Sequence, residues 1–172
     1  ALPLLEKRGL RDCQYNAEIK FEESLKLGNK KNLAVLATGS GKTYLACLAS
    51  YRLLNYTSTK RILFLVDRNN LARQTETEFS LFDRTENQMR MGDLYTINRL
   101  KKETDIKSDI VISTIQKLFA VLTGQDIQEG NEDAEDEIAK NDEEKDNNEV
   151  VELGDDLKLP PDYFQLIIVD DE

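Results

Sequence analysis

Histidine is absent from the 172-residue sequence and cysteine is scarce, with only Cys13 and Cys47. Zinc sites are built mainly from cysteine and histidine at short, regular spacings, and these two cysteines show no such spacing. A disulfide framework requires several cysteine pairs in a small secreted chain. We therefore expect two free thiols, with neither a zinc site nor a disulfide framework.

Long apolar runs are missing as well. No stretch approaches the roughly 18 apolar residues that a membrane-spanning helix needs, and the N-terminus lacks a signal-peptide pattern. An apolar content of 40% over 172 residues suits one globular domain with a core. The sequence predicts a cytoplasmic domain without membrane contact. Its first nine residues lack methionine and indicate the end of a linker in a longer protein.

Charge is unevenly distributed along the chain, whose formal net charge is −10. Residues 126–158 hold fifteen acids against three lysines, a net of −12, so the other residues carry +2. Because this stretch also has few aromatic residues and little periodicity, we expect a flexible insertion over about residues 123–160. The mildly basic remainder is compatible with nucleic-acid binding. Alternatively, the insertion docks a partner or mimics DNA.

Residues 32–43, NLAVLATGSGKT, carry the most specific pattern. The apolar run from Leu33 to Leu36 predicts a strand, followed by a glycine-bearing turn and a helix. Glycines in such a turn let backbone N–H groups approach a polyphosphate closely, helped by the positive end of the helix. A lysine there can reach outer phosphates, and a threonine hydroxyl can hold magnesium. The predicted phosphate loop comprises Thr38, Gly39, Ser40, Gly41, Lys42 and Thr43.

An amphipathic helix is predicted before this loop, between Leu10 and Asn29, with Ala17, Phe21 and Leu25 at helical spacing. Gln14 lies near its start. A glutamine there is often a solvated or capping residue. Its amide can also read the N6 and N7 edge of adenine, and its place some thirty residues before the loop makes it an adenine-reading candidate.

The remaining pattern alternates apolar runs with helical segments, which predicts an α/β fold. Strands are expected at Ile62–Val66, Ile110–Ile112 and Leu166–Val169, with a possible short strand at Asp93–Ile97. A helix after the loop should pack Leu45, Leu48, Ala49 and Leu53 inward. Another should carry Leu71, Ala72, Thr75 and Phe79, capped by Asn69 or Asn70, and a third should end at Leu122.

Polar residues follow the expected strands, where ligands collect in open α/β sheets. Asp67 and Arg68 follow one strand. Ser113, Thr114 and Gln116 follow another, where they are either helix-capping residues or contacts to a nucleic-acid phosphate. Asp170, Asp171 and Glu172 follow the last strand. An acid there can hold magnesium while its neighbour polarises the attacking water, although the three acids could also be a solvated tail.

The segments LRDCQ, LATGSGKT, RILFLVDRNNLARQT, ISTIQ and LIIVDDE together resemble the ATPase motor of the restriction subunit of type I restriction enzymes, within helicase superfamily 2. The chain is similar to the first RecA-like lobe of that motor. The resemblance implies an α/β P-loop NTPase fold over residues 32–172, a mostly parallel sheet with helices on both faces, preceded by a linker and helix over 1–31. It also implies ATP and Mg²⁺ as cofactors.

By this resemblance, Gln14 reads adenine, although Cys13 stands where an aromatic residue is usual, and Leu36 replaces a loop glycine that superfamily 2 commonly lacks. Asp170 would be the magnesium ligand with Asp171 in place of the usual glutamate, or, with one inserted residue, the pair would be Asp171 and Glu172. The residues implied to follow the DNA strand are Asp67, Arg68, Gln74, Thr114 and Gln116.

The implied activity is ATP hydrolysis coupled to translocation along double-stranded DNA. It requires a second RecA-like lobe, and DNA cleavage requires a nuclease domain in the same longer chain, with modification and specificity subunits as partners. The chain alone is expected to hydrolyse ATP slowly or not at all. Three alternatives are another superfamily 2 lobe, a small P-loop switch or kinase, and a docking module acting through the acidic insertion.

Overall fold

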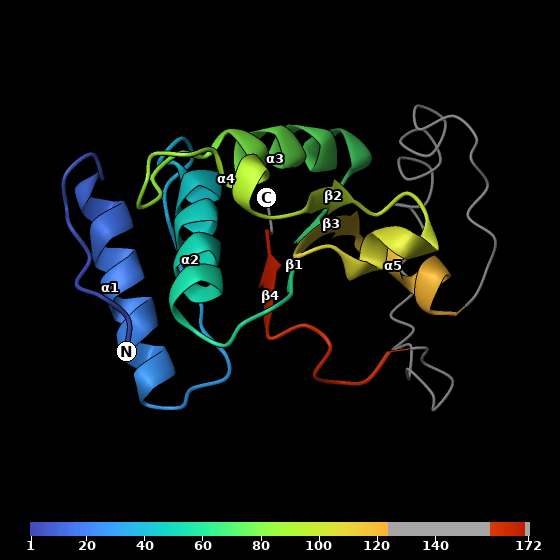
Figure 1. Ribbon diagram of the computed structural model, residues 1–172, viewed down its shortest axis with the longest axis horizontal. Coiled ribbons are helices and arrows are strands. Elements are labelled where there is room, and N and C mark those ends of the chain that lie inside the picture. Colours follow the sequence, from blue (N-terminus) through green and yellow to red (C-terminus); the bar gives the residue numbers. More distant parts are fainter. Residues whose placement is uncertain (124–158, 171–172) are drawn as a thin grey trace.

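The computed structural model describes residues 1–123 and 159–170, which form an all-parallel sheet with helices packed against it (Figure 1). The strand order in this sheet is β2-β3-β1-β4. The described elements are α1 (Asp12–Lys26), α2 (Lys42–Tyr56), β1 (Ile62–Val66), α3 (Asn69–Leu81), α4 (Met91–Leu94), β2 (Ile97–Arg99), the 3₁₀ helix η1 (Glu103–Lys107), β3 (Ile110–Thr114), α5 (Ile115–Leu122) and β4 (Leu166–Val169).

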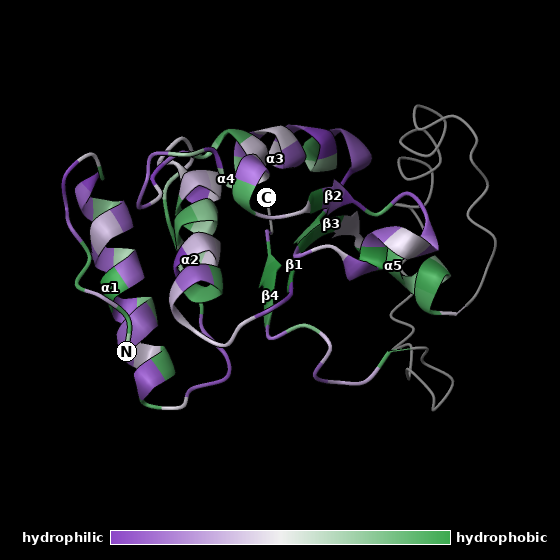
Figure 2. Ribbon diagram, in the orientation of Figure 1, coloured by the Kyte–Doolittle hydropathy of each residue, from purple (hydrophilic) through white to green (hydrophobic). Residues whose placement is uncertain are grey.

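Side chains of the central strand β1 alternate between two hydrophobic clusters, as the pleat of a strand requires. Ile62, Phe64 and Val66 belong to the larger cluster, which includes residues of α2 and α3. Leu63 belongs to the smaller cluster on the other face, with Val121 of α5. Because both faces are covered, β1 reads as a continuous apolar run in the sequence. In Figure 2, β4 and the first part of β3 are green, the hydrophobic end of the colour scale.

The strands predicted at Ile62–Val66 and Leu166–Val169 are confirmed, and the strand predicted at Ile110–Ile112 extends to Thr114. The possible strand at Asp93–Ile97 is wrong in its position. Met91–Leu94 forms the short helix α4, and β2 begins only at Ile97. The predicted helices are present, but the N-cap of α3 is Arg68 rather than an asparagine.

The strand predicted at Leu33–Leu36 is absent. The structure assigns no strand to these residues, and the side chains of Leu33 and Val35 are 90% and 86% exposed. A strand forms only where its N–H and C=O groups pair with a neighbour, and an apolar run alone does not supply that neighbour. In the described residues, β4 pairs only with β1, so the other side of β4 is an open edge.

The buried face of α1 also differs from the prediction. Ala17, Phe21 and Leu25 are only partly buried, whereas its fully buried residues are Gln14, Glu18 and Glu22. α1 lies beside α2 rather than on the sheet (Figure 1). A polar row buried between two helices requires specific partners, which are described below.

No helix among the described residues is long and apolar enough to cross a membrane. The acidic insertion expected over residues 123–160 lies almost wholly outside the described part of the chain.

Candidate nucleotide and nucleic-acid site

The predicted phosphate loop leads directly into α2. Gly41 is the N-cap of this helix, with φ of +84°, and Gly39 has φ of +74°. Both values lie in the left-handed region that favours glycine. The loop is closed by a hydrogen bond from the Ser40 N–H to the Ala37 carbonyl at 3.1 Å, and Leu45 N–H donates to the Gly41 carbonyl at 3.0 Å. The turn and helix start therefore match the prediction without the preceding strand.

Gln14 contacts the loop. Its Nε2 donates to the carbonyl oxygen of Gly41 at 3.1 Å, and its Oε1 accepts from the backbone N–H of Arg11 at 3.0 Å. The side chain is buried, with 4% exposure. Arg11 reaches the loop as well, since its Nη1 donates to the Gly39 carbonyl at 2.6 Å. The start of α1 is thus attached to the loop at two points.

The loop has features that fit a bound polyphosphate and magnesium. Ser40 Oγ is buried without a hydrogen-bond partner among the described residues, although a buried hydroxyl normally has one. The first turn of α2 also has N–H groups without intrahelical partners. Lys42 and Thr43 begin this helix and are half-buried, whereas Thr38 is exposed.

Asp170 follows β4 directly. Its N–H donates to the Leu65 carbonyl of β1 at 3.0 Å, which fixes its backbone at the carboxyl edge of the sheet. The side chain is partly buried. Asp171 and Glu172, the other two candidate acids, lie outside the described residues.

The candidate nucleic-acid residues follow β1 and β3 at the same carboxyl edge of the sheet. Asp67 and Arg68 form an exposed ion pair of 3.6 Å, and Gln74 is exposed on α3, where its Nε2 donates to Glu78. Thr114 caps α5 by accepting from the Lys117 N–H at 3.3 Å, while Gln116 is exposed. The capping role of Thr114 is therefore present in the structure.

Sequence reasoning missed a basic pocket at the ends of β2 and β3. It is lined by Asn69, Ala72, Arg99, Leu100, Lys101, Ile112, Ser113, Thr114 and Lys117. Every charged residue in this described lining is basic. The missed cations are Arg99 and Lys101, in the segment INRLKK, and Lys117, the third residue of α5. Predicting that they share a pocket would have required knowing that β2 and β3 are neighbours.

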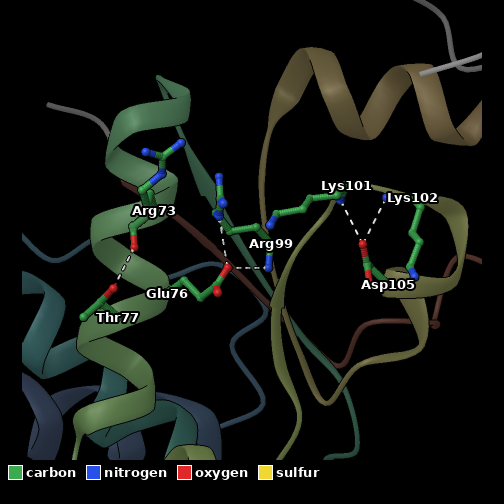
Figure 3. A network of polar contacts seen from close by, with 7 residues as sticks. All are labelled: Arg73, Glu76, Thr77, Arg99, Lys101, Lys102 and Asp105. Atoms are coloured by element: carbon green, nitrogen blue, oxygen red, sulfur yellow. Dashed lines mark hydrogen bonds and ion pairs between the residues drawn. The ribbon is translucent and has the colours of Figure 1, made fainter. Parts of the chain in front are cut away.

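Two carboxylates hold this basic region in place (Figure 3). Glu76 of α3 accepts from the Arg99 backbone N–H at 2.9 Å and from Arg99 Nε at 3.1 Å. Asp105 accepts from the backbone N–H groups of Lys101 and Lys102, each at 3.0 Å. The acids thus fix the backbone after β2, while the side chains of Lys101 and Lys102 remain exposed.

The parallel sheet and the loop at the start of α2 place the chain in the RecA-like class of α/β domains. Residues 7–172 match the family described as "Type III restriction enzyme, res subunit", and the chain belongs to this family. The predicted fold and the resemblance to the restriction subunit are confirmed, which makes the chain a helicase-like lobe of a restriction-enzyme subunit.

Several endonuclease subunits of type I restriction enzymes are similar to the chain. The EcoKI subunit of Escherichia coli strain K12 is 33% identical over 117 residues, covering 67% of the chain and 10% of that protein. The SauCOLORF180P subunit of Staphylococcus aureus strain COL is 31% identical over 111 residues, covering 64% of the chain and 11% of that protein. The EcoAI subunit of Escherichia coli is 46% identical over 66 residues, covering 38% and 8%.

The chain therefore spans about a tenth of the length of these relatives. Among solved structures, a nuclease-deletion mutant of the Type ISP restriction-modification enzyme LlaGI, in complex with a DNA substrate mimic, matches with a TM-score of 0.45 and 19% identity. That match covers 72% of the chain and 14% of the chain of the deletion mutant.

Proposed function

We propose that the chain is the ATP-binding lobe of a DNA translocase in a type I restriction enzyme, coupling ATP hydrolysis to movement along double-stranded DNA. The observation that carries this proposal is the loop from Gly39 to Thr43. Its left-handed glycines lead into a helix N-terminus, and Gln14 lies against its Gly41 carbonyl. A phosphate-binding turn beside an amide that can recognise adenine suits a nucleoside triphosphate.

Each loop residue has a proposed role. The N–H groups of Gly39 and Gly41 and the unpaired Ser40 Oγ would face the phosphates, Lys42 would neutralise the outer phosphates, and the Thr43 hydroxyl together with Asp170 would hold Mg²⁺. Magnesium bound there would neutralise charge on the phosphates. The acid that orients the attacking water is Asp171 or Glu172.

The carboxyl edge formed by β1 and β3 is the proposed DNA surface. Arg68, Gln74, Thr114 and Gln116 lie there with Asp67, and the neighbouring pocket adds Arg99, Lys101 and Lys117. Cations at a surface that also offers the exposed side-chain amide of Gln116 suit contacts to phosphate, which fix position without reading sequence. The chain would therefore contact the DNA backbone rather than its bases.

The proposal places this lobe in a longer cytoplasmic protein. A second RecA-like lobe would supply an arginine finger, which is worth roughly 10³ to 10⁵ in rate where it has been studied. A nuclease domain would cut DNA, and modification and specificity subunits would complete the enzyme. The isolated chain should bind ATP and magnesium weakly, hydrolyse slowly or not at all, and leave DNA uncut.

The test is a titration of the purified chain with a fluorescent ATP analogue and Mg²⁺. Wild type should bind, Lys42→Ala should lose most binding, and Lys20→Ala, an exposed lysine on α1, should bind like wild type. Equal binding by wild type and Lys42→Ala, or binding by neither, would contradict the proposed nucleotide site. Measurable DNA cleavage by the chain would contradict its place as a motor lobe.

A further inference from the structure

The interface between α1 and α2 is unusual because the fully buried residues of α1 are all polar. Gln14, Glu18 and Glu22 follow each other at intervals of four residues, so they form one row along the helix. Glu18 and Glu22 are 2% and 6% exposed. Burying a carboxylate is costly unless a charge or hydrogen bonds compensate it, so this row needs a specific partner.

Arg52 of α2 is that partner. Its Nε donates to Glu22 Oε1, and its Nη2 donates to Glu22 Oε2 at 3.2 Å, which makes a two-point contact between the guanidinium and the carboxylate. Both side chains are less than a tenth exposed. Arg52 Nη2 also donates to the Pro3 carbonyl. The planar fork of arginine gives such a pair a defined geometry as well as charge neutralisation.

Glu18 is the third buried side chain of this cluster. Burial raises the pKa of Glu18 from its ordinary value of 4.5 to about 8, and a hydrogen bond with Glu22 contributes. The two buried carboxyl groups of Glu18 and Glu22 thus interact directly within the cluster. Glu22 and Arg52 remain as one compensated pair of opposite charges.

The polar row contacts α2 at two separated points. At one end Gln14 bonds the Gly41 carbonyl at the start of α2, and at the other Glu22 bonds Arg52 near its end. Gln14 and Glu22 are eight residues apart, about 12 Å along a helix. Two directional contacts this far apart fix both the rotation and the sliding of α1 on α2.

Gln14 also has hydrogen-bonding capacity left. A glutamine amide has two N–H donors and an oxygen with two lone pairs. One N–H of the Gln14 amide donates to the Gly41 carbonyl, and one lone pair of its oxygen accepts from the Arg11 backbone N–H. One donor and one acceptor remain, the combination that matches the N7 acceptor and N6 donor of adenine.

We propose that the Glu22–Arg52 ion pair is a positioning device for base recognition, holding Gln14 where its amide selects adenine over guanine. This inference rests on the proposed function of the loop. Neither Glu22 nor Arg52 touches the nucleotide. They act by fixing the position and rotation of α1 on α2.

The test compares nucleotide selectivity in the full-length protein, measured as displacement of a fluorescent ATP analogue by ATP or by GTP in the presence of Mg²⁺. Glu22→Gln removes the charge while keeping the shape. Glu23→Gln is the matched control, because Glu23 is the adjacent, exposed residue of α1. Arg52→Lys keeps the charge but loses the fork. Gln14→Ala lacks the side-chain amide and therefore gives the reference ratio of ATP to GTP binding expected without adenine recognition.

Wild type should prefer ATP over GTP by roughly tenfold or more, the scale of a two-point amide contact to a base. Glu22→Gln and Arg52→Lys should lower this ratio at least about threefold, toward that of Gln14→Ala, by weakening ATP binding while GTP binding stays unchanged. Glu23→Gln should keep the wild-type ratio. A merely structural role would weaken ATP and GTP binding alike, and that result would overturn the inference.

The double variant Glu22→Leu with Arg52→Met covers the case in which a single change unfolds the domain, because apolar residues often replace a buried ion pair without loss of stability. This double variant should fold and still show only a weak preference for ATP over GTP. Recovery of full selectivity would show that any tight packing suffices and would overturn the inference. Failure of wild type to bind nucleotide would instead refute the proposed function, and binding without preference would refute the role of Gln14.

Discussion

The side-chain nitrogen of Gln14 lies 3.1 Å from the carbonyl oxygen of Gly41, so the first helix contacts the predicted phosphate loop here as well as through Arg11. A Cβ atom at residue 41 would lie only 2.3 Å from this nitrogen. Gly41 is therefore a glycine for two reasons, its positive φ and the close approach of Gln14.

Replacing Gly41 by alanine should weaken nucleotide binding by about tenfold or more and lower the free energy of unfolding by about 1–3 kcal/mol, because the backbone is strained and Gln14 must move. Gly39→Ala is the matched control. It has a similar φ of +74°, but no atom lies within 4 Å of its added Cβ. Equilibrium urea unfolding and nucleotide titration of both variants would measure the difference, and equal effects would contradict a role for the contact with Gln14.

Removing the basic side chains at the carboxyl edge should weaken DNA binding evenly across DNA sequences. Lys101→Ala and Lys117→Ala should each reduce the slope of log K against log salt by roughly one unit if each lysine contacts one phosphate. The measurement is fluorescence anisotropy of labelled duplexes at several salt concentrations, using the full-length protein.

Lys60 and Lys107 provide the controls for this experiment. They line a second pocket together with Arg61 and Asp109, at the opposite, amino ends of β1 and β3. Lys60→Ala and Lys107→Ala change the net charge by the same amount but should leave the salt slope unchanged. A uniform effect of all four variants would indicate an effect of overall charge rather than a phosphate site.

The stability of the domain should fall as pH rises from about 4.5 to about 8. The pKa of the Glu18 carboxyl is raised from 4.5 to about 8, mainly by burial, with contributions from Glu22 and an opposing one from Arg52. Across this window the unfolded chain has lost the proton that the folded chain keeps, so unfolding releases a proton and is favoured by rising pH. The contribution is on the order of a few kcal/mol.

Urea unfolding at pH 5, 6.5 and 8.5 would measure this slope. Glu18→Gln cannot ionise and should flatten it, whereas Glu23→Gln should retain the wild-type slope because Glu23 is exposed. An unchanged slope in Glu18→Gln would show that another group is responsible.

The two thiols should differ sharply in reactivity. Cys13 is exposed, whereas Cys47 is buried, and that burial raises the pKa of the Cys47 thiol well above its ordinary value. The thiolate is the reactive form of cysteine, so in the folded chain a maleimide should label Cys13 quickly and Cys47 slowly. Cys13→Ser should abolish the fast phase and Cys47→Ser should leave it intact. Labelling of both thiols at equal rates would contradict the burial of Cys47.

The elements that were predicted best are those whose pattern of apolar residues has only one physical explanation. Ile62–Val66 is a continuous apolar run because both faces of β1 are covered, and the helix after the loop buries Leu45, Leu48, Ala49 and Leu53 as expected. The same apolar signal failed at Leu33–Leu36, because a sequence run indicates capacity for burial but not which strand will pair with it.

The charged features were the hardest to predict. Glu18 and Glu22 look like the solvated face of a helix, and only the position of Arg52, thirty residues from Glu22, makes them interior residues. The basic pocket likewise combines segments that meet only when β2 and β3 pair. Such sites depend on long-range contacts, which local propensity and periodicity do not contain.

The open edge of β4 has a practical consequence. Ile167 and Val169 are 53% and 60% exposed on a strand whose outer N–H and C=O groups have no β partner in the described residues. Such an edge is a template on which another chain can add a strand, and neither proline nor charge interrupts Leu166–Val169. Recombinant preparations of the chain alone should therefore lose solubility as concentration rises, and a lysine at position 167 should counter this loss.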